Sequence, residues 1–247
     1  MFSLIRTASF MVLMLSATLP SALIAQAQSS SSQTDPAQPA KPAQSTGAAS
    51  VQARIRARRE ARRAAAIHDV YSHLFEVYVG GGYERFQPGT SLQRVNEYSW
   101  DVGATRYFSQ KLGVTVDARG NYGTVYLKPS QDLGTNISHP GVSEYTWMGG
   151  PTYRFILHPK YSISGRVMAG AALGNFSSDT SGFGATTFHI WPDGVGAAAS
   201  VSAPVEYNFS PTIGLRLAPE YLLTSFGSTI QNSLGFTGGV VVRWGKQ

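Results

Sequence analysis

The sequence predicts an all-β fold: an eight-stranded antiparallel up-and-down transmembrane β-barrel with a disordered, arginine-rich N-terminal tail. Three observations lead to this prediction. From residue 74 onward, apolar and polar residues alternate with a period of two, which is typical of strands. The alternating segments number eight, and their connections differ in length in a regular way. Charged residues make up 14% of the chain, well below the roughly 25% of soluble domains, so part of the surface must meet something other than water.

Composition excludes several classes of function. The chain has 247 residues and no cysteine, which rules out disulfides, a thiol nucleophile and thiolate metal sites. The net charge of +6 is concentrated in residues 28–70, where seven basic residues face three acidic ones. Residues 71–247 hold twelve basic and eleven acidic residues and are nearly neutral. We therefore expect no nucleic-acid partner.

Residues 1–27 are predicted to be a signal peptide. Arg6 supplies the positive start, an apolar stretch begins at Phe10, and the small residues Ala25 and Ala27 flank Gln26 as in a cleavage site. We expect cleavage after Ala27, the alternative being an N-terminal membrane anchor. No later segment has 18 consecutive apolar residues, so no transmembrane helix is expected in the mature chain.

Residues 28–70 are predicted to be a disordered, basic tail in the periplasm. Up to Ser50 the tail is rich in Ser, Gln, Ala, Pro and Thr and has too few large apolar residues to offset the entropy lost on ordering. Alanine and arginine over 51–66 favour a nascent helix. Its basic residues are Arg54, Arg56, Arg58, Arg59, Arg62 and Arg63. They either stay solvated during export or contact an anion, such as lipid headgroups or a cell-wall polymer.

The domain 71–247 holds the eight predicted strands. Each is long enough for a tilted strand to cross a bilayer, which takes about 9–11 residues. In the third, Leu112 and Val116 fall on one face and Asp117 and Arg119 on the other. A soluble lipocalin-like barrel would show the same alternation with the apolar face inward, so alternation alone leaves both folds open. The predicted segments are 73–85, 97–108, 111–126, 142–156, 160–174, 194–209, 212–225 and 231–244.

Connection lengths favour the membrane barrel. The connections after the second, fourth and sixth segments are tight. The others are longer and rich in Gly, Ser, Thr and Asn, near 86–96, 127–141, 175–193 and 226–230. Alternation of short turns with long outer loops over an even number of strands is typical of transmembrane barrels. Four extracellular loops follow, with both termini in the periplasm. Aromatic residues cluster near both sets of connections, as in two interfacial belts.

Three stretches carry a resemblance to a known family: 79–83 (VGGGY), 100–108 (WDVGATRYF) and 237–244 (TGGVVVRW). On these residues the chain resembles the small OmpA/OmpX-like outer-membrane barrels. The last stretch is similar to the signal read by the barrel-assembly machinery, through Thr237, Gly239, Val242 and Trp244. The resemblance implies a monomer in the outer membrane of a Gram-negative cell, surrounded by phospholipid and lipopolysaccharide.

If the apolar face points outward, the charges point into a lumen only wide enough for side chains. An unpaired buried charge costs several kcal/mol, so we expect acids and arginines there to form ion pairs. The network either plugs the lumen or acts as a gate. The expected members are Glu76, Glu84, Asp101, Asp117, Arg119, Glu144, Arg154, Arg166, Glu206, Arg216, Glu220 and Arg243.

The sequence predicts a non-enzymatic protein without cofactor or bound metal, acting in envelope integrity or in surface interaction through its loops. No His-x-Ser pair lies on an outward strand face, and His139 with Ser143 remains as a candidate nucleophile and base. The alternatives are a narrow gated channel, a lipid A-modifying hydrolase and a soluble lipocalin-like binder.

Overall fold

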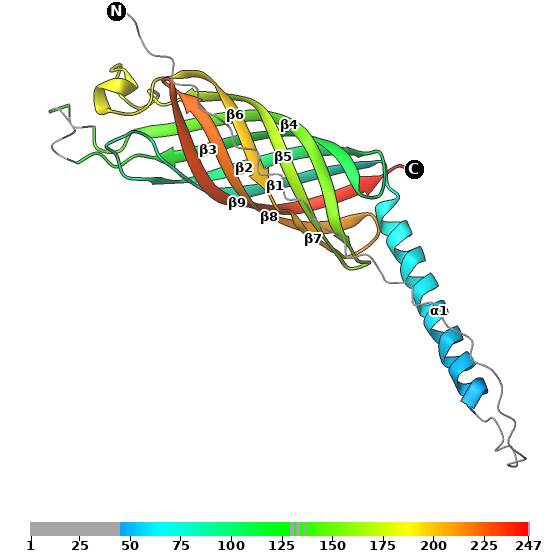
Figure 1. The fold of residues 1–247 in the computed structure, drawn as a ribbon. Helices are drawn as coiled ribbons and strands as arrows, with labels where there is room; N and C mark the ends of the chain where they lie inside the picture. The colour runs from blue at the N-terminus through cyan, green and yellow to red at the C-terminus, as the bar shows by residue number, and fades with distance from the viewer. Residues whose placement is uncertain (1–44, 129–130, 132–133, 136, 247) are drawn as a thin grey trace, which may run out of the picture. The chain divides into compact units, whose positions relative to one another are not determined.

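The computed structural model describes residues 45–128, 131, 134–135 and 137–246, so the predicted signal peptide lies outside it. Its main feature is a single antiparallel sheet of nine strands (Figure 1). Each end of the eight predicted segments lies within two residues of an observed strand end, and the sixth segment is divided into two strands. The strands are β1 (Phe75–Phe86), β2 (Val95–Tyr107), β3 (Leu112–Thr124), β4 (Gly141–Leu157), β5 (Tyr161–Asn175), β6 (Gly194–Ser202), β7 (Val205–Asn208), β8 (Ile213–Phe226) and β9 (Thr229–Trp244).

The sheet closes on itself into an eight-stranded barrel. Consecutive strands pair with one another, except β6 and β7, and β9 pairs with β1 from Phe75–Trp244 to Arg85–Leu234. β6 and β7 together make one side of the ring, since both pair with β5 and with β8. The break between them falls at Pro204, which has no N–H to donate to a neighbouring strand. The predicted eight-stranded antiparallel barrel is confirmed.

The barrel is preceded by a helix, α1 (Ser45–Tyr71), of 27 residues. Residues 45–70 of the predicted disordered tail are thus helical, and the nascent helix expected over 51–66 extends further at both ends. Runs of alanine and arginine, both strong helix formers, explain the helix over 51–66. The rest of the predicted tail lies outside the described residues. Among the helices of the described residues, none is long and apolar enough to cross a membrane.

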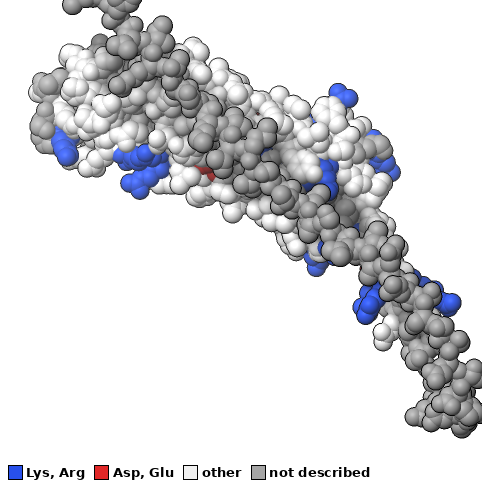
Figure 2. Space-filling view, in the orientation of Figure 1, with Lys and Arg blue, Asp and Glu red and all other residues white. Residues whose placement is uncertain are grey.

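The barrel wall has an apolar outer face and a polar inner face. On β3, Val114 and Val116 are 45% and 59% exposed, whereas Asp117 and Arg119 are 5% and 4% exposed. All acidic residues of the strands are buried inside. On the face drawn in Figure 2, most of the described barrel surface is uncharged. The aromatic belts are not uniform, since Tyr107 and Phe226 are each 2% exposed and point inward.

The connections define two ends of the barrel. Residues 108–111, 158–160 and 209–212 make tight turns at the end where α1 and Trp244 also lie, called here the turn end. Residues 87–94, 176–193 and the described residues of 125–140 belong to long connections at the other end, the loop end. The fourth expected loop, 226–230, was wrong: Phe226 pairs with Thr229. Gly227 and Ser228 have φ of 60° and 63°, the type I′ geometry that closes a hairpin with two residues.

Apolar side chains fill the loop end of the barrel. Phe176, which follows β5, stacks on Phe86 of β1 with ring centroids 6.0 Å apart and meets Phe226 of β8 at 5.1 Å. Because β1 and β5 lie on opposite sides of the ring, these contacts cross the lumen. We call this buried cluster the apolar lid. It consists of Phe86, Leu92, Val95, Val125, Leu127, Val142, Phe176, Phe188, Ile190 and Phe226.

Candidate functional site: the charged lumen

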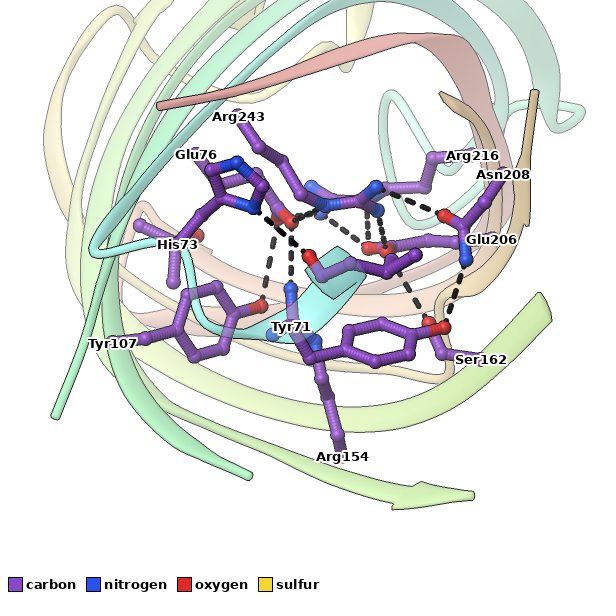
Figure 3. Close-up of polar contacts among 12 residues, drawn as sticks. Tyr71, His73, Glu76, Tyr107, Arg154, Ser162, Glu206, Asn208, Arg216 and Arg243 are labelled. Carbon is purple, nitrogen blue, oxygen red and sulfur yellow. Dashed lines mark hydrogen bonds and ion pairs between the residues drawn. The ribbon is translucent and has the colours of Figure 1, made fainter. Parts of the chain in front are cut away.

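Two carboxylates and three arginines meet inside the turn end of the barrel (Figure 3). Oε2 of Glu76 accepts hydrogen bonds from Nη2 of Arg154 at 2.7 Å and from Nε of Arg243 at 2.9 Å. Oε1 of Glu76 accepts one from Arg216. Glu206 accepts from Nε of Arg216 at 3.0 Å and from Nη2 of Arg243 at 2.5 Å. These five residues, here the Glu76 cluster, span the lumen because Arg154 comes from β4 and Glu76 from β1.

Tyr71, the last residue of α1, lies against the Glu76 cluster. Its side chain is fully buried, donates to the carbonyl of His158 at 2.9 Å and accepts from Nδ2 of Asn208 at 2.8 Å. The guanidinium carbon of Arg154 lies 4.9 Å from its ring centre, within cation–π range. Burial raises the pKa of the Tyr71 phenol, which keeps its proton available for the His158 carbonyl. Tyr71 therefore attaches the end of the basic helix to the lumen.

A second cluster lies deeper in the lumen around Arg119. Nη2 of Arg119 is 2.6 Å from Oε2 of Glu220, 3.8 Å from Asp101 and 3.7 Å from Asp117. The space beside Arg119, Glu220 and Glu84 is about 10 Å³, no more than one water molecule needs. Side chains therefore occupy this part of the lumen almost completely.

A third group of carboxylates, nearer the loop end, has no arginine partner. Glu84 lies directly opposite Glu97 in the β1–β2 register, and Asn121 donates to Glu84 at 3.2 Å. Both oxygens of Glu97 and of Glu144 are buried without a hydrogen-bond partner among the described residues. The expectation that lumen acids form ion pairs with arginines was therefore wrong for Glu84 and Glu144, which belong to no ion pair among the described residues. Arg119 already lies within 4 Å of three other acids. Sequence alone does not show how far along the barrel axis each charge lies.

The lumen is thus polarised along the barrel. Glu76 and Glu84 are eight residues apart on β1, which at roughly 3.4 Å per residue is about 27 Å. Arginines outnumber acids in the Glu76 cluster, whereas the Glu84, Glu97 and Glu144 group is purely acidic. The apolar lid lies directly beyond it, since Phe86 follows Glu84 on the inward face of β1. The arrangement fills space and holds strands together.

Replacing Glu97 by glutamine is expected to leave the barrel as stable as the parent or about 1 kcal/mol more stable, because like charges directly opposite each other on paired strands destabilise a sheet and a buried unpaired carboxylate is costly. Glutamine keeps the shape of the side chain. Urea unfolding of the protein in detergent micelles, followed by tryptophan fluorescence, measures the effect. A loss of more than about 1 kcal/mol would show that Glu97 has a stabilising partner.

The remaining predicted site residues fall in several places. Arg166 is 5% exposed and faces inward, but no ion pair among the described residues includes it. Of the predicted assembly signal, Val242 and Trp244 face outward on β9 and Thr237 faces inward. The basic residues of α1, Arg54, Arg56, Arg58, Arg59, Arg62 and Arg63, are all exposed.

The candidate catalytic pair does not form. Nδ1 of His139 lies 2.8 Å from Oγ of Ser138, whereas Ser143 donates to the carbonyl of Asn175. The ring of His139 packs on Tyr126 at 5.4 Å between centroids. Within the part of the chain that the structure describes, no three metal-ligating side chains come together.

Sequence reasoning missed Glu97, a threonine row and the apolar lid. Glu97 lies four residues before Asp101 on β2 and therefore points inward as Asp101 does. The predicted segment begins at Glu97, whereas β2 begins at Val95. Thr105, Thr115 and Thr152 link three neighbouring strands inside the barrel, with Oγ–Oγ distances of 2.8 and 2.7 Å. Apolar residues within the long connections would have indicated the lid.

The closed ring, the apolar outer wall and the charged, filled lumen together define the architecture of a small transmembrane β-barrel of the outer-membrane class. No family model and no curated protein sequence matches the chain. Among solved structures, it is similar to Neisserial surface protein A, with 16% identity, a TM-score of 0.47 and coverage of 69% of this chain and 97% of that one. Similarity also extends to Ail, the attachment invasion locus protein of Yersinia pestis (14%, TM-score 0.42, coverage 68% and 97%). OprG from Pseudomonas aeruginosa is a third (11%, TM-score 0.46, coverage 71% and 98%).

Proposed function

We propose that this protein is a non-enzymatic barrel of the outer membrane with a plugged lumen, serving envelope integrity or surface interaction. The observation that carries the proposal is the lumen, which side chains cross at both ends: the Glu76 cluster with Tyr71 at the turn end and the apolar lid at the loop end. Ion pairs that bridge opposite strands stiffen a barrel without leaving a path for solutes.

In this proposal the loop end lies outside the cell and both termini lie in the periplasm. Short turns in the periplasm and longer connections outside are the usual arrangement of such barrels. The three long connections then form the outer surface. Two of them, 87–94 and 176–193, are held together, because Trp191 donates from Nε1 to the carbonyl of Gln87 at 2.7 Å and from its backbone N–H to Pro88 at 2.9 Å. Two connections held together in this way suit recognition of a partner.

The proposed partners contact the barrel wall, β9 and α1. The barrel wall contacts phospholipid and lipopolysaccharide, and the barrel-assembly machinery inserts it through β9. The exposed arginines of α1 lie in the periplasm, where they attract an anionic cell-wall polymer. The barrel is proposed to act as a monomer.

Single-channel recording tests the plugged lumen. The full-length mature protein, refolded in detergent and shown to change gel mobility on boiling, is expected to give no stable openings in a planar bilayer. The filled lumen leaves no continuous path for ions. Openings that change on neutralising Arg154 or Glu220 would instead make the network a gate and the protein a narrow channel. A change in lipid A acyl content on overexpression would indicate a hydrolase.

A further inference from the structure

The outward faces of the strands carry an unusual charge pattern. Only Arg85 and Arg106 are charged and exposed there among the described strand residues, and no acid accompanies them. Arg85 lies near the loop end of β1, and Arg106 lies near the turn end of β2. Neither belongs to any ion pair among the described residues. Arg106 is thus a cation on an apolar wall, and no described residue supplies its counterion.

Arg106 lies among aromatic rings. Its guanidinium carbon is 6.0 Å from the ring centre of Phe75 and 5.6 Å from that of Phe108. Phe75 in turn stacks on Trp244, with centroids 6.2 Å apart. Aromatic side chains at the end of a barrel wall mark the level of the lipid headgroups. Arg106 therefore lies at the depth of a headgroup phosphate.

An apolar groove leads from Arg106 along the wall. Its floor is Ala104, which lies in register between Val77 of β1 and Val116 of β3. The larger valines rise on either side of the small side chain. One part of the groove, of about 300 Å³, reaches Arg106 and Trp244, and the other, of about 570 Å³, reaches Trp147. Both parts share Val77, Ala104 and Val116, so they form one continuous depression.

We propose that this groove is a binding site for one glycerophospholipid, with the phosphate on Arg106 and an acyl chain over Ala104. The guanidinium matches the geometry of two phosphate oxygens, and charge-assisted hydrogen bonds are stronger at this depth than in water. The inference rests on the proposed location in a membrane. A second copy of the chain fits the site less well, because the outward strand faces hold no acid to meet Arg106.

Fluorescence quenching tests the site in the full-length protein in detergent micelles. Trp147 and Trp244 line the groove, so phosphatidylglycerol with brominated acyl chains is expected to quench them in a saturable way. Arg106→Gln is expected to weaken binding about tenfold, the usual value of a charge-assisted hydrogen bond. Ala104→Phe fills the groove and is expected to abolish saturable quenching. The matched controls, Arg85→Gln and Val201→Phe, lie on the outer wall away from the groove and should bind as the parent does.

Several outcomes would overturn the site. Equal quenching in Arg106→Gln and Arg85→Gln would mean that lipid coats the wall without preference. Full displacement by millimolar inorganic phosphate would assign Arg106 to free phosphate, and a dimer lost in Ala104→Phe would assign the groove to a second copy. If the parent shows no mobility shift on boiling, the proposed membrane barrel itself fails. A boiling-sensitive barrel without saturable quenching rejects only the lipid site.

Discussion

Replacing Glu76 by glutamine is expected to lower the free energy of unfolding by about 3–5 kcal/mol, because it removes the carboxylate shared by three buried arginines. Arg154, Arg216 and Arg243 all donate to Glu76, and Glu206 alone would remain to face them. Glutamine preserves the volume but carries no charge. Urea unfolding in micelles, followed by tryptophan fluorescence and by the mobility shift on boiling, measures the loss.

The matched control is Glu144→Gln. It makes the same chemical change at a site that is equally buried but has no arginine partner. Its free energy of unfolding is expected to equal or exceed that of the parent. If Glu76→Gln fails to fold, the double variant Glu76→Gln/Arg154→Met should recover part of the stability, since it removes one orphaned cation. Similar losses in Glu76→Gln and Glu144→Gln would contradict the central role of the Glu76 cluster.

Truncating Phe176 to alanine is expected to cost about 3–5 kcal/mol, the usual range for a buried phenylalanine, and to open the loop end. Phe176 is fully buried and joins Phe86 to Phe226 across the lumen. Hydrogen exchange of the backbone amides near Phe86 and Phe226 should quicken, whereas exchange around Glu76 should stay slow.

Phe155→Ala serves as the control for the lid. Phe155 is 63% exposed on the outer wall of β4, so its loss removes a similar ring without touching the lumen. Exchange at the loop end should match the parent in this variant. If Phe176→Ala left exchange unchanged, the apolar lid would not be what closes that end of the barrel.

The fold was predictable because its signals are local. Alternation places Val116 outside and Asp117 inside without knowledge of any partner strand, and tight turns mark the strand ends. The connection between β8 and β9 was expected to be a loop over 226–230. Phe226, Thr229 and Ile230 in that range are strand residues, and only Gly227 and Ser228 form the turn. A Gly-Ser pair between alternating segments is itself a hairpin signal, so the information was present in the sequence.

The pairing within the lumen was not predictable in the same way. The alternation of residues along each strand shows that Glu76 and Glu144 both face inward, but strand tilt and register decide which arginines they reach. Glu76 meets an arginine of β4, and Glu144 meets none. The helix extends past residue 66, its predicted C-terminal end, because Tyr71 is held by His158 and Asn208, which lie 87 and 137 positions further along the chain.

The seam between β1 and β9 sets an order of events for folding. It pairs Phe75 with Trp244, whereas β8 and β9 join through two residues and form a hairpin on their own. Closing a long loop costs entropy that a hairpin avoids. The ring can therefore close only after the whole strand array has reached the same compartment. Until then both edge strands present unpaired backbone groups, which can pair with other chains.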